Sequence, residues 1–550
     1  MRECMSRHPQ PPPAPSRTWT APTWICTSAT VLRAETLSNL LRAAAATAPD
    51  APAFRYRDER ITYAGWDALA ERMARAFAAR GIGRGDVVAL LLPSTPLYPI
   101  AYLAAARLGA VTAGINVRYR RAEIEHLLRR SGAALLVGVE AWHDADFRNA
   151  VDPLRAGIPT LREVAWIGAD AVRASTNAVV EILAAGATAV PPVDVAADDP
   201  AAIIFTSGTT GIPKGAWYAH RSLLALAEID ARRHPAGVPR FATHLAAGLS
   251  FAHVGTMARI AVQIGTLGCT LVHDAFNPAA VLAAIGRERL TNLGAIPTQM
   301  VMLLDHPERP GHDLSSLRSV LLGGAPSSPA LIRRVRDTLD VEVSVRYSST
   351  EVGIATASLP EDPADVLATT VGKPTPGVEL RIVDERNVGV PADATGEVVV
   401  RSPATMRGYW RDPDATAATI DAEGWVHTGD LGFLDGAGYL HLVGRRSDMF
   451  IRGGYNVHPI EVEALLARHP KIARAAVVGV PDDVFGEIGW AFVVPRDPSD
   501  APTLAELRTF VGGELASFKR PDGLTVIDDL PVTAMFKTDR AALLERWRRR

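Results

Sequence analysis

A loop of small residues follows a short apolar run, and it limits what this chain can fold into more than any other stretch. Ala201–Phe205 has the composition of a buried strand, and Thr206–Gly215 continues it with the letters TSGTTGIPKG. Glycines in such a loop let backbone N–H groups approach an anion closely, while hydroxyls and a lysine add polar contacts. The loop is therefore a candidate polyphosphate site. Its candidate contacts are Thr206, Ser207, Gly208, Thr209, Thr210, Gly211 and Lys214.

The loop is not a Walker A motif, because Pro213 stands where the second Gly would be required, counting from Gly208. The ten-letter string instead resembles the phosphate-binding loop of the adenylate-forming superfamily, which includes acyl-CoA synthetases, adenylation domains of peptide synthetases and luciferases. This resemblance implies that ATP is a substrate. The segment after the loop, Ala216–Leu226, is mostly compatible with a helix.

Strand-like and helix-like segments alternate on the N-terminal side of the loop. Val87–Leu92 and Ala134–Val137 are apolar runs typical of buried strands, whereas Leu97–Leu108 and Arg121–Ser131 have helical spacing. Such alternation favours an α/β fold with a parallel sheet covered on both faces. After Gly444–Asp448 the pattern changes to a compact α+β unit.

We therefore predict an α/β protein with a large N-terminal domain of layered α/β subdomains, residues 36–444. A small mobile α+β C-terminal domain follows, residues 445–550. Residues 1–35 are expected to form a disordered N-terminal extension, because residues 1–30 are rich in Pro, Ser and Thr. Part of this extension could precede the natural start of the protein.

Charge and cysteine content exclude several classes of function. The chain has 58 Lys and Arg against 60 Asp and Glu, so no electrostatic footprint for nucleic acid or an anionic membrane is expected. The one dense basic run, Arg546–Arg550, is interpreted as a solvated tail. Three widely separated cysteines give neither a disulfide framework nor metal-ligand spacing, which fits a reducing cytoplasm. No apolar run is long enough to span a membrane, and no signal-peptide core is present.

A second motif, Tyr347–Glu351 with the letters YSSTE, follows the strand-like run Val341–Val345. A carboxylate there suits Mg²⁺, which prefers oxygen ligands and takes most of them from phosphate and water. The resemblance implies that Glu351 holds Mg²⁺, Thr350 contacts the α-phosphate and Tyr347 stacks on adenine. Ser348 and Ser349 would lie beside the nucleotide, with Ser348 where the family usually has Gly.

A third motif, Trp425–Asp430 with the letters WVHTGD, matches the Thr-Gly-Asp string of the superfamily. A carboxylate after a tight turn can accept hydrogen bonds from the vicinal hydroxyls of a ribose. The resemblance implies that Asp430 and Arg445 bind the ribose of AMP. The flanking strings Gly396–Arg401 and Gly408–Trp410 also match the family, and a structural role is assigned to them.

The acid would lie beside two further segments. The string GGAP follows the apolar run Ser319–Leu322, and the family places such a segment against adenine and the acyl pocket. His253 aligns with a family histidine near that pocket, with a buried structural histidine as the alternative. The nucleotide candidates are Gly323, Gly324, Ala325 and Pro326. The acyl-pocket candidates are His253, Val254, Gly255 and Gly353.

The expected walls of the acyl pocket are His253–Met257, Leu322–Ala325 and Gly353–Ala355, and they carry no Arg or Lys. A second carboxylate would therefore lack a cation to bind it. The walls favour fatty or other apolar acids, aromatic and alicyclic ones included, over dicarboxylates.

Lys537, in the string LPVTAMFK from Leu530, matches the catalytic lysine of the family. An ammonium that bridges the attacking carboxylate and the α-phosphate offsets their mutual repulsion. Phe536 stands where the family usually has Gly. The resemblance also implies a hinge at Ser447, where relatives often carry Asp or Lys. It further implies a CoA path along Gly453 and Gly454, with Lys519 as a contact for CoA phosphate.

The motifs together predict an AMP-forming acyl-CoA ligase that uses ATP, Mg²⁺ and CoA. Two alternatives remain open. The first is an acyl-AMP ligase that loads a carrier protein, although the stretch from Glu351 to Thr428 is short for the insertion that such relatives carry. The second is a non-catalytic protein that binds acyl-adenylate, which only the departures at Ser348, Ser447 and Phe536 support.

Overall fold

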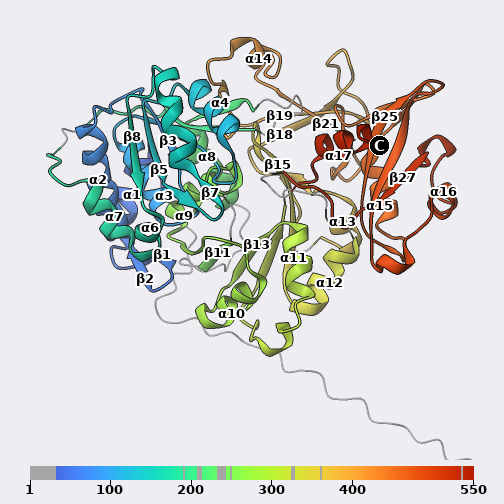
Figure 1. Cartoon of the computed structure of the whole chain (residues 1–550), viewed down its shortest axis with the longest axis horizontal. Helices are drawn as coiled ribbons and strands as arrows, with labels where there is room; N and C mark the ends of the chain where they lie inside the picture. The colour runs from blue at the N-terminus through green and yellow to red at the C-terminus, as the bar shows by residue number, and fades with distance from the viewer. Residues whose placement is uncertain are drawn as a thin grey trace, which may run out of the picture.

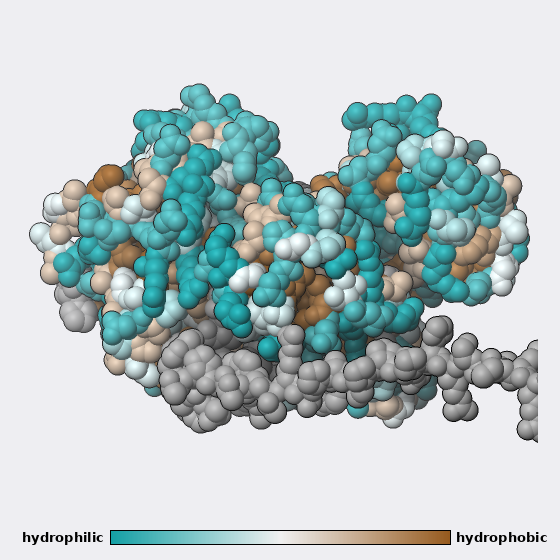
Figure 2. Space-filling model, turned by 90° about the horizontal axis from the view of Figure 1, so that it is seen from below, coloured by the Kyte–Doolittle hydropathy of each residue, from teal (hydrophilic) through white to brown (hydrophobic). Residues whose placement is uncertain are grey.

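The structure is a computed structural model that describes residues 32–189, 193–206, 213–231, 243–247, 250–323, 327, 329–359, 362–533 and 537–550. The predicted extension therefore lies almost entirely outside the described residues. Figure 1 shows a large body on the left and centre, and a smaller lobe on the right that carries α15, α16 and β25. In Figure 2 a notch separates this lobe from the rest of the molecule. No helix of the described chain could cross a membrane.

The sheet that holds the phosphate loop has seven strands among the described residues. It is parallel from β9 to β8, and antiparallel where β10 and β20 join it. In order across the sheet the strands are β20 (Gly408–Tyr409), β10 (Gly215–Ala219), β9 (Pro200–Phe205), β4 (Val111–Gly114), β3 (Val87–Leu91), β5 (Leu135–Val139) and β8 (Glu163–Ile167). β3 is buried along its whole length, as its apolar run predicts.

A second sheet of nine described strands carries the glutamate motif at one end. Its central strands are parallel, and short antiparallel strands close both edges. In order the strands are β17 (Lys373–Pro374), β16 (Gly353–Ala357), β15 (Glu342–Ser349), β14 (Ser319–Leu322), β13 (Asn292–Ala295), β11 (Thr243–Ala247), β12 (Cys269–His273), β1 (Pro52–Tyr56) and β2 (Glu59–Thr62).

Two smaller sheets follow along the chain. The first is antiparallel and consists of β18 (Glu379–Val383), β19 (Gly396–Arg401), β21 (Val426–Leu434) and β22 (Leu440–Arg445). The second forms the right-hand lobe and consists of β24 (Tyr455–Val457), β23 (Phe450–Arg452), β26 (Gly486–Pro495), β25 (Ile472–Asp482) and β27 (Gly523–Val526). A two-stranded ribbon, β6 (Ala141–Trp142) and β7 (Ala145–Asp146), stands apart.

Helices pack between and around the sheets, and α4 ends as its sequence predicts, because Gly132 caps it in a left-handed conformation with φ of 67°. The helices are α1 (Leu37–Thr47), α2 (Tyr63–Ala79), α3 (Leu97–Arg107), α4 (Arg121–Ser131), α5 (Phe147–Val151), α6 (Ala169–Ala174), α7 (Thr176–Leu183), α8 (His220–Ala231), α9 (Val254–Thr266), α10 (Pro278–Glu288), α11 (Pro297–Leu304), α12 (Pro329–Leu339), α13 (Ala364–Thr369), α14 (Pro413–Ala417), α15 (Pro459–Leu466), α16 (Leu504–Gly512) and α17 (Arg540–Arg548).

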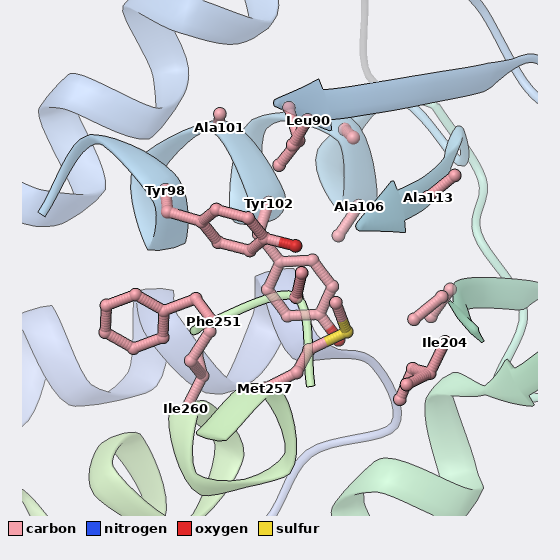
Figure 3. Packing of buried hydrophobic residues seen from close by; sticks show 14 of the residues in the cluster. Leu90, Tyr98, Ala101, Tyr102, Ala106, Ala113, Ile204, Phe251, Met257 and Ile260 are labelled. Atoms are coloured by element: carbon pink, nitrogen blue, oxygen red, sulfur yellow. The ribbon is translucent and has the colours of Figure 1, made fainter. Parts of the chain in front are cut away.

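The largest hydrophobic core lies between the seven-stranded sheet and the helices that pack on it. Figure 3 shows Tyr98 and Tyr102 of α3 facing Met257 and Ile260 of α9, with Phe251 beside them. The rings of Tyr98 and Phe251 stack with their centres 5.7 Å apart. This packing sets the position of α9, and so of the acyl-pocket candidates at its N-terminus.

The structure modifies two predictions from the sequence. The segment after the phosphate loop begins as strand β10 and becomes helical only at His220, because its backbone pairs with β9 on one side and β20 on the other. The arginines of the C-terminal basic run are exposed, as a solvated run predicts, but the run is not a free tail. Its first three residues end α17, whose Leu543 is buried and whose Trp547 packs against Trp490.

Candidate active site

The phosphate loop connects the two antiparallel strands β9 and β10. The N–H of Thr206 donates to the carbonyl of Lys214 at 2.9 Å, which holds the two ends of the loop together. The predicted contacts Ser207, Gly208, Thr209, Thr210 and Gly211 lie outside the described residues. The stem nevertheless places the half-buried Lys214 at the base of the loop.

The glutamate motif follows directly from β15, and hydroxyl groups surround it. The Tyr409 hydroxyl donates to Glu351 Oε1 at 3.0 Å, and the Ser349 hydroxyl donates to Oε2 at 2.9 Å. The Tyr218 hydroxyl donates to the carbonyl of Thr350 at 2.6 Å. The ammonium of Lys214 lies 5.2 Å from the centre of the Tyr409 ring. The structure therefore brings the phosphate loop and the glutamate motif to one place.

The predicted ribose contacts form a network with the predicted adenine-stacking residue. Asp430 on β21 stands opposite Arg445 on β22, and Arg445 Nε lies 2.9 Å from Asp430 Oδ1. The Tyr347 hydroxyl donates to Asp430 Oδ2 at 2.5 Å. Burial raises the pKa of Asp430, and the charge of Arg445 and the Tyr347 hydrogen bond oppose that rise. Ser348, which follows Tyr347 in the same motif, is exposed.

A buried glutamate that the sequence did not single out supports this network. Glu397 on β19 accepts from the N–H of Gly429 at 3.0 Å and contacts His427 Nδ1 at 3.2 Å. Its other partner is the guanidinium of Arg446, at 3.3 Å. Glu397 therefore ties the Thr-Gly-Asp turn to the start of the linker that leads into the C-terminal lobe.

Lys537 reaches this site from the C-terminal lobe. The position of the Lys537 backbone is fixed by two contacts. Val532 and Thr538 form a β-bridge, and the N–H of Thr533 donates to the carbonyl of Lys537 at 2.8 Å. The Lys537 residue as a whole is exposed. The protein around its ammonium nevertheless desolvates that group and thereby lowers its pKa. The charge of Arg445 lowers this pKa further, whereas Asp430 and Glu351 raise it. Phe536 lies outside the described residues.

The N-terminus of α9 carries the acyl-pocket candidates Val254 and Gly255. His253 is the N-cap of this helix, and its Nδ1 accepts from the N–H of Gly255 at 3.2 Å. Burial, and then the charge of Lys537, lower the pKa of His253 to about 4. The imidazole is therefore neutral near pH 7. Its position is compatible with a structural role as helix cap and with a place beside the acyl pocket.

Two glycines complete the predicted pocket. Gly353 has φ of +68°, and a Cβ atom there would lie 2.4 Å from Leu226 Cδ1, so only Gly fits. Gly323 follows β14 directly and faces the carbonyl of Arg346. Gly324, Ala325 and Pro326 lie outside the described residues.

The predicted hinge residue Ser447 follows Arg445 by two positions, and the predicted CoA residues lie in the C-terminal lobe. Ser447 is exposed, and its hydroxyl donates to Asp448 at 3.2 Å. Gly453 and Gly454 form the exposed turn between β23 and β24, with φ of +57° and +86°. Lys519 is paired with Glu461 at 2.5 Å, so this lysine is not a free cation in this arrangement. The described residues predicted for adenylation thus contact one another, whereas those predicted for CoA lie in the C-terminal lobe.

The sequence analysis did not identify three residues of this site, Tyr218, Glu397 and Tyr409. Tyr409 lies in the string Gly408–Trp410, to which only a structural role was assigned, and Glu397 lies in Gly396–Arg401. Both strings match the family, but the contacts of Tyr409 and Glu397 depend on which strands pair with β20 and β19. Tyr218 carried no signal in the sequence.

The chain is similar to known proteins over both parts of the structure. The family model of the AMP-binding enzyme matches residues 41–410, and that of the AMP-binding enzyme C-terminal domain matches residues 461–537. A 3-[(3aS,4S,7aS)-7a-methyl-1,5-dioxo-octahydro-1H-inden-4-yl]propanoyl:CoA ligase of Mycobacterium tuberculosis (strain ATCC 25618 / H37Rv) is 39% identical, covering 90% of this chain and 96% of that protein. A feruloyl-CoA synthase of Amycolatopsis sp is 33% identical, covering 89% of this chain and 94% of that protein.

A solved structure shows the same fold. The crystal structure of ATP-bound MatB from Rhodopseudomonas palustris superposes with a TM-score of 0.82 at 30% identity, covering 93% of this chain and 99% of that one. The matches therefore extend over nearly the whole chain and over both parts of the structure. The chain belongs to the AMP-binding enzyme family of adenylate-forming acid–CoA ligases.

Proposed function

We propose that this chain converts a carboxylic acid with an apolar, ring-bearing body into its CoA thioester through an acyl-AMP intermediate. One observation carries the proposal: Lys537 of the C-terminal lobe lies close enough to Glu351 and Asp430 of the large body that their charges oppose the lowering of its pKa by desolvation. A cation at that position is what carboxylate attack on the α-phosphate of ATP requires.

The first half-reaction uses the gathered residues. A carboxylate oxygen of the acid forms a bond to the α-phosphorus, the bond to the bridging oxygen breaks, and pyrophosphate leaves with the electron pair. Lys214 and the loop Thr206–Gly215 would bind the leaving pyrophosphate, and Thr350 would contact the α-phosphate. Lys537 would neutralise charge on the carboxylate and the phosphate, and such contacts are commonly worth about 10²–10³ in rate.

Glu351 fits the role of a Mg²⁺ ligand. Each of its oxygens accepts one hydroxyl hydrogen bond and keeps a lone pair for a cation. Mg²⁺ takes most of its ligands from phosphate and water, so it needs few ligands from protein. When bound, Mg²⁺ would neutralise charge on the phosphates of ATP.

The nucleoside would lie against the Tyr347–Asp430–Arg445 network. Asp430 has one oxygen bonded to the Tyr347 hydroxyl and the other to Arg445, so its orientation is held before the ribose arrives. The Tyr347 ring is anchored through its hydroxyl and would stack on adenine. Ser348 and Ser349, with Gly323–Pro326, would line the same side of the nucleotide.

The second half-reaction needs another arrangement. The sulfur of CoA attacks the acyl carbon, and AMP leaves with the electrons of the broken bond. We assign residues 36–444 to the adenylation domain and residues 445–550 to a mobile domain that rotates at Ser447. Rotation would remove Lys537 and bring the exposed turn Gly453–Gly454 to the site, with Lys519 released from Glu461 to meet a CoA phosphate.

The nature of the acid follows from the pocket candidates. The described positions among them are apolar or small apart from His253, and burial keeps that histidine neutral. Two relatives named above act on acids with fused or aromatic rings. We therefore propose a ring-bearing apolar acid in preference to a dicarboxylate.

The test supplies purified protein with ATP, Mg²⁺ and a panel of indane-type, aryl, fatty and dicarboxylic acids, with and without CoA. Acid-dependent AMP release that requires CoA, strongest with ring-bearing acids, would support the proposal. Pyrophosphate exchange without any CoA thioester would favour a carrier-loading enzyme instead. No exchange with any acid would favour a non-catalytic binding protein.

A further inference from the structure

Tyr409 contacts both charged residues that we assign to the triphosphate of ATP. Its hydroxyl donates to Glu351 Oε1 at 3.0 Å, and its ring centre lies 5.2 Å from Lys214 Nζ. Tyr409 is buried, and its hydroxyl is the donor in the contact with Glu351.

Strand pairing explains how Tyr409 reaches this position. Tyr409 on β20 stands opposite Ala216 on β10, two residues after Lys214. The N–H of Trp410 donates to the carbonyl of Gly215 at 2.7 Å, which fastens β20 to the stem of the phosphate loop. The N–H of Met406 donates to the carbonyl of Glu351 at 2.8 Å. One short segment therefore joins the phosphate loop to the glutamate motif.

The two residues that contact the phenol carry opposite charges. Among the described residues, neither Lys214 nor Glu351 forms an ion pair, although both contact the same side chain. A cation is attracted to the face of an aromatic ring, and a carboxylate accepts from its hydroxyl at the edge. Without the ring the two charges could pair directly, and ATP would have to break that pair on binding.

We propose that Tyr409 is a positioning residue that holds Lys214 and Glu351 apart, so that Lys214 meets the pyrophosphate group and Glu351 meets a divalent cation. The proposal rests on the proposed function, because it takes ATP as the ligand. It assigns a task in nucleotide binding to a residue of the flanking string Gly408–Trp410.

Two variants separate the two contacts. Tyr409→Phe removes the hydroxyl bond to Glu351 and keeps the ring under Lys214. Tyr409→Leu removes both. Calorimetry would measure the Kd of ATP with excess EDTA and the Kd of ATP with excess Mg²⁺ for each variant, and neither measurement depends on turnover.

Tyr439 provides a matched control. Its hydroxyl donates to Asp362 Oδ1 at 2.7 Å, and Lys373 Nζ lies 4.3 Å from its ring centre. It precedes β22, at the opposite end of the β21–β22 hairpin from the Asp430–Arg445 pair. Tyr439→Phe therefore removes the same kind of hydrogen bond beside a lysine and outside the site.

We expect Tyr409→Phe to raise the Kd of MgATP about tenfold and that of metal-free ATP less than about twofold, since one hydrogen bond to a charged group is lost. We expect Tyr409→Leu to weaken both nucleotides about tenfold or more. Tyr439→Phe should change neither by more than about twofold. Equal weakening of both nucleotides by Tyr409→Phe, or unchanged MgATP binding, would overturn the proposal.

The wild-type protein keeps this test distinct from that of the proposed function. The expected Kd changes in the Tyr409 variants, together with a wild type that binds MgATP but releases no AMP with any acid, would support the positioning role and contradict the ligase. Wild type that turns over acids while Tyr409→Phe binds MgATP normally would contradict the positioning role alone. Absence of MgATP binding by wild type would contradict both.

Discussion

Arg445 and Asp430 face each other across the β21–β22 hairpin, and their ion pair, at 2.9 Å, lies two residues before Ser447. The next residue, Arg446, donates its N–H to the carbonyl of Gly429 at 2.9 Å and directs its guanidinium at Glu397. The linker to the C-terminal lobe therefore begins inside the predicted ribose site. Rotation of that lobe and binding of the nucleotide would act on the same few residues.

Substitution of Lys537 should separate the two half-reactions. We expect Lys537→Ala to slow adenylation about 10²–10³-fold, because the cation beside the attacking carboxylate is lost. The same variant should still form thioester from supplied acyl-AMP and CoA. Pyrophosphate exchange and thioester formation would be measured in parallel, with the surface variant Lys471→Ala as control. An equal loss in both half-reactions would contradict the assignment of two arrangements.

A rigid residue at Ser447 should affect the opposite half-reaction. We expect Ser447→Pro to slow thioester formation at least about tenfold relative to adenylation, because proline restricts the backbone rotation that the domain movement needs. Ser447→Asp, the residue that relatives often carry, should behave like wild type. Single-turnover measurements of each step would show the difference. If both substitutions left the ratio of the two steps unchanged, the hinge would lie elsewhere.

The Tyr347 hydroxyl should contribute to ATP binding through Asp430. We expect Tyr347→Phe to lower kcat/KM for ATP about tenfold, since one charge-assisted hydrogen bond is lost while the ring remains for stacking. Tyr347→Ala should cost more because it also removes the ring. Steady-state pyrophosphate exchange at varied ATP would measure both. Equal losses in the two variants would mean that the hydroxyl, not the ring, carries the whole contribution.

The buried His220 should make the protein less stable in weak acid. Burial lowers its pKa to about 4, and its Nδ1 accepts from the N–H of Leu37 at 3.3 Å. In the unfolded chain the imidazole titrates near pH 6.5, so its neutral burial costs nothing above that pH. Between about pH 6.5 and pH 4 the unfolded state binds the additional proton, and stability falls as pH falls.

The measurement compares Tm for wild type and His220→Gln from pH 7.5 to pH 4.5. The substitution keeps an acceptor but removes the titration, so the advantage of wild type should shrink as the pH falls. His253 titrates in the same window and is present in both proteins. A constant difference in Tm across this range would show that His220 is not the group responsible.

Local patterns in the sequence were sufficient for most elements. Val87–Leu92 was predicted as a buried strand and β3 is one, Arg121–Ser131 was predicted as a helix that Gly132 ends, and α4 has those bounds. These succeed because periodicity and end signals act within a few residues. Ala216–Leu226 is helical only from His220, since its first residues are held in β10 by hydrogen bonds to β9 and β20.

The sequence by itself determined the family, the order of its motifs and the kind of chemistry, because these depend on residue types at short spacing. Only the tertiary structure decided that Tyr409 contacts both Lys214 and Glu351, and that Glu397 contacts both Gly429 and Arg446. The physical reason is distance along the chain. A hydrogen bond or a charge acts over a few ångströms. Strand pairing brings remote segments that close, and a local sequence pattern does not indicate which segments these are.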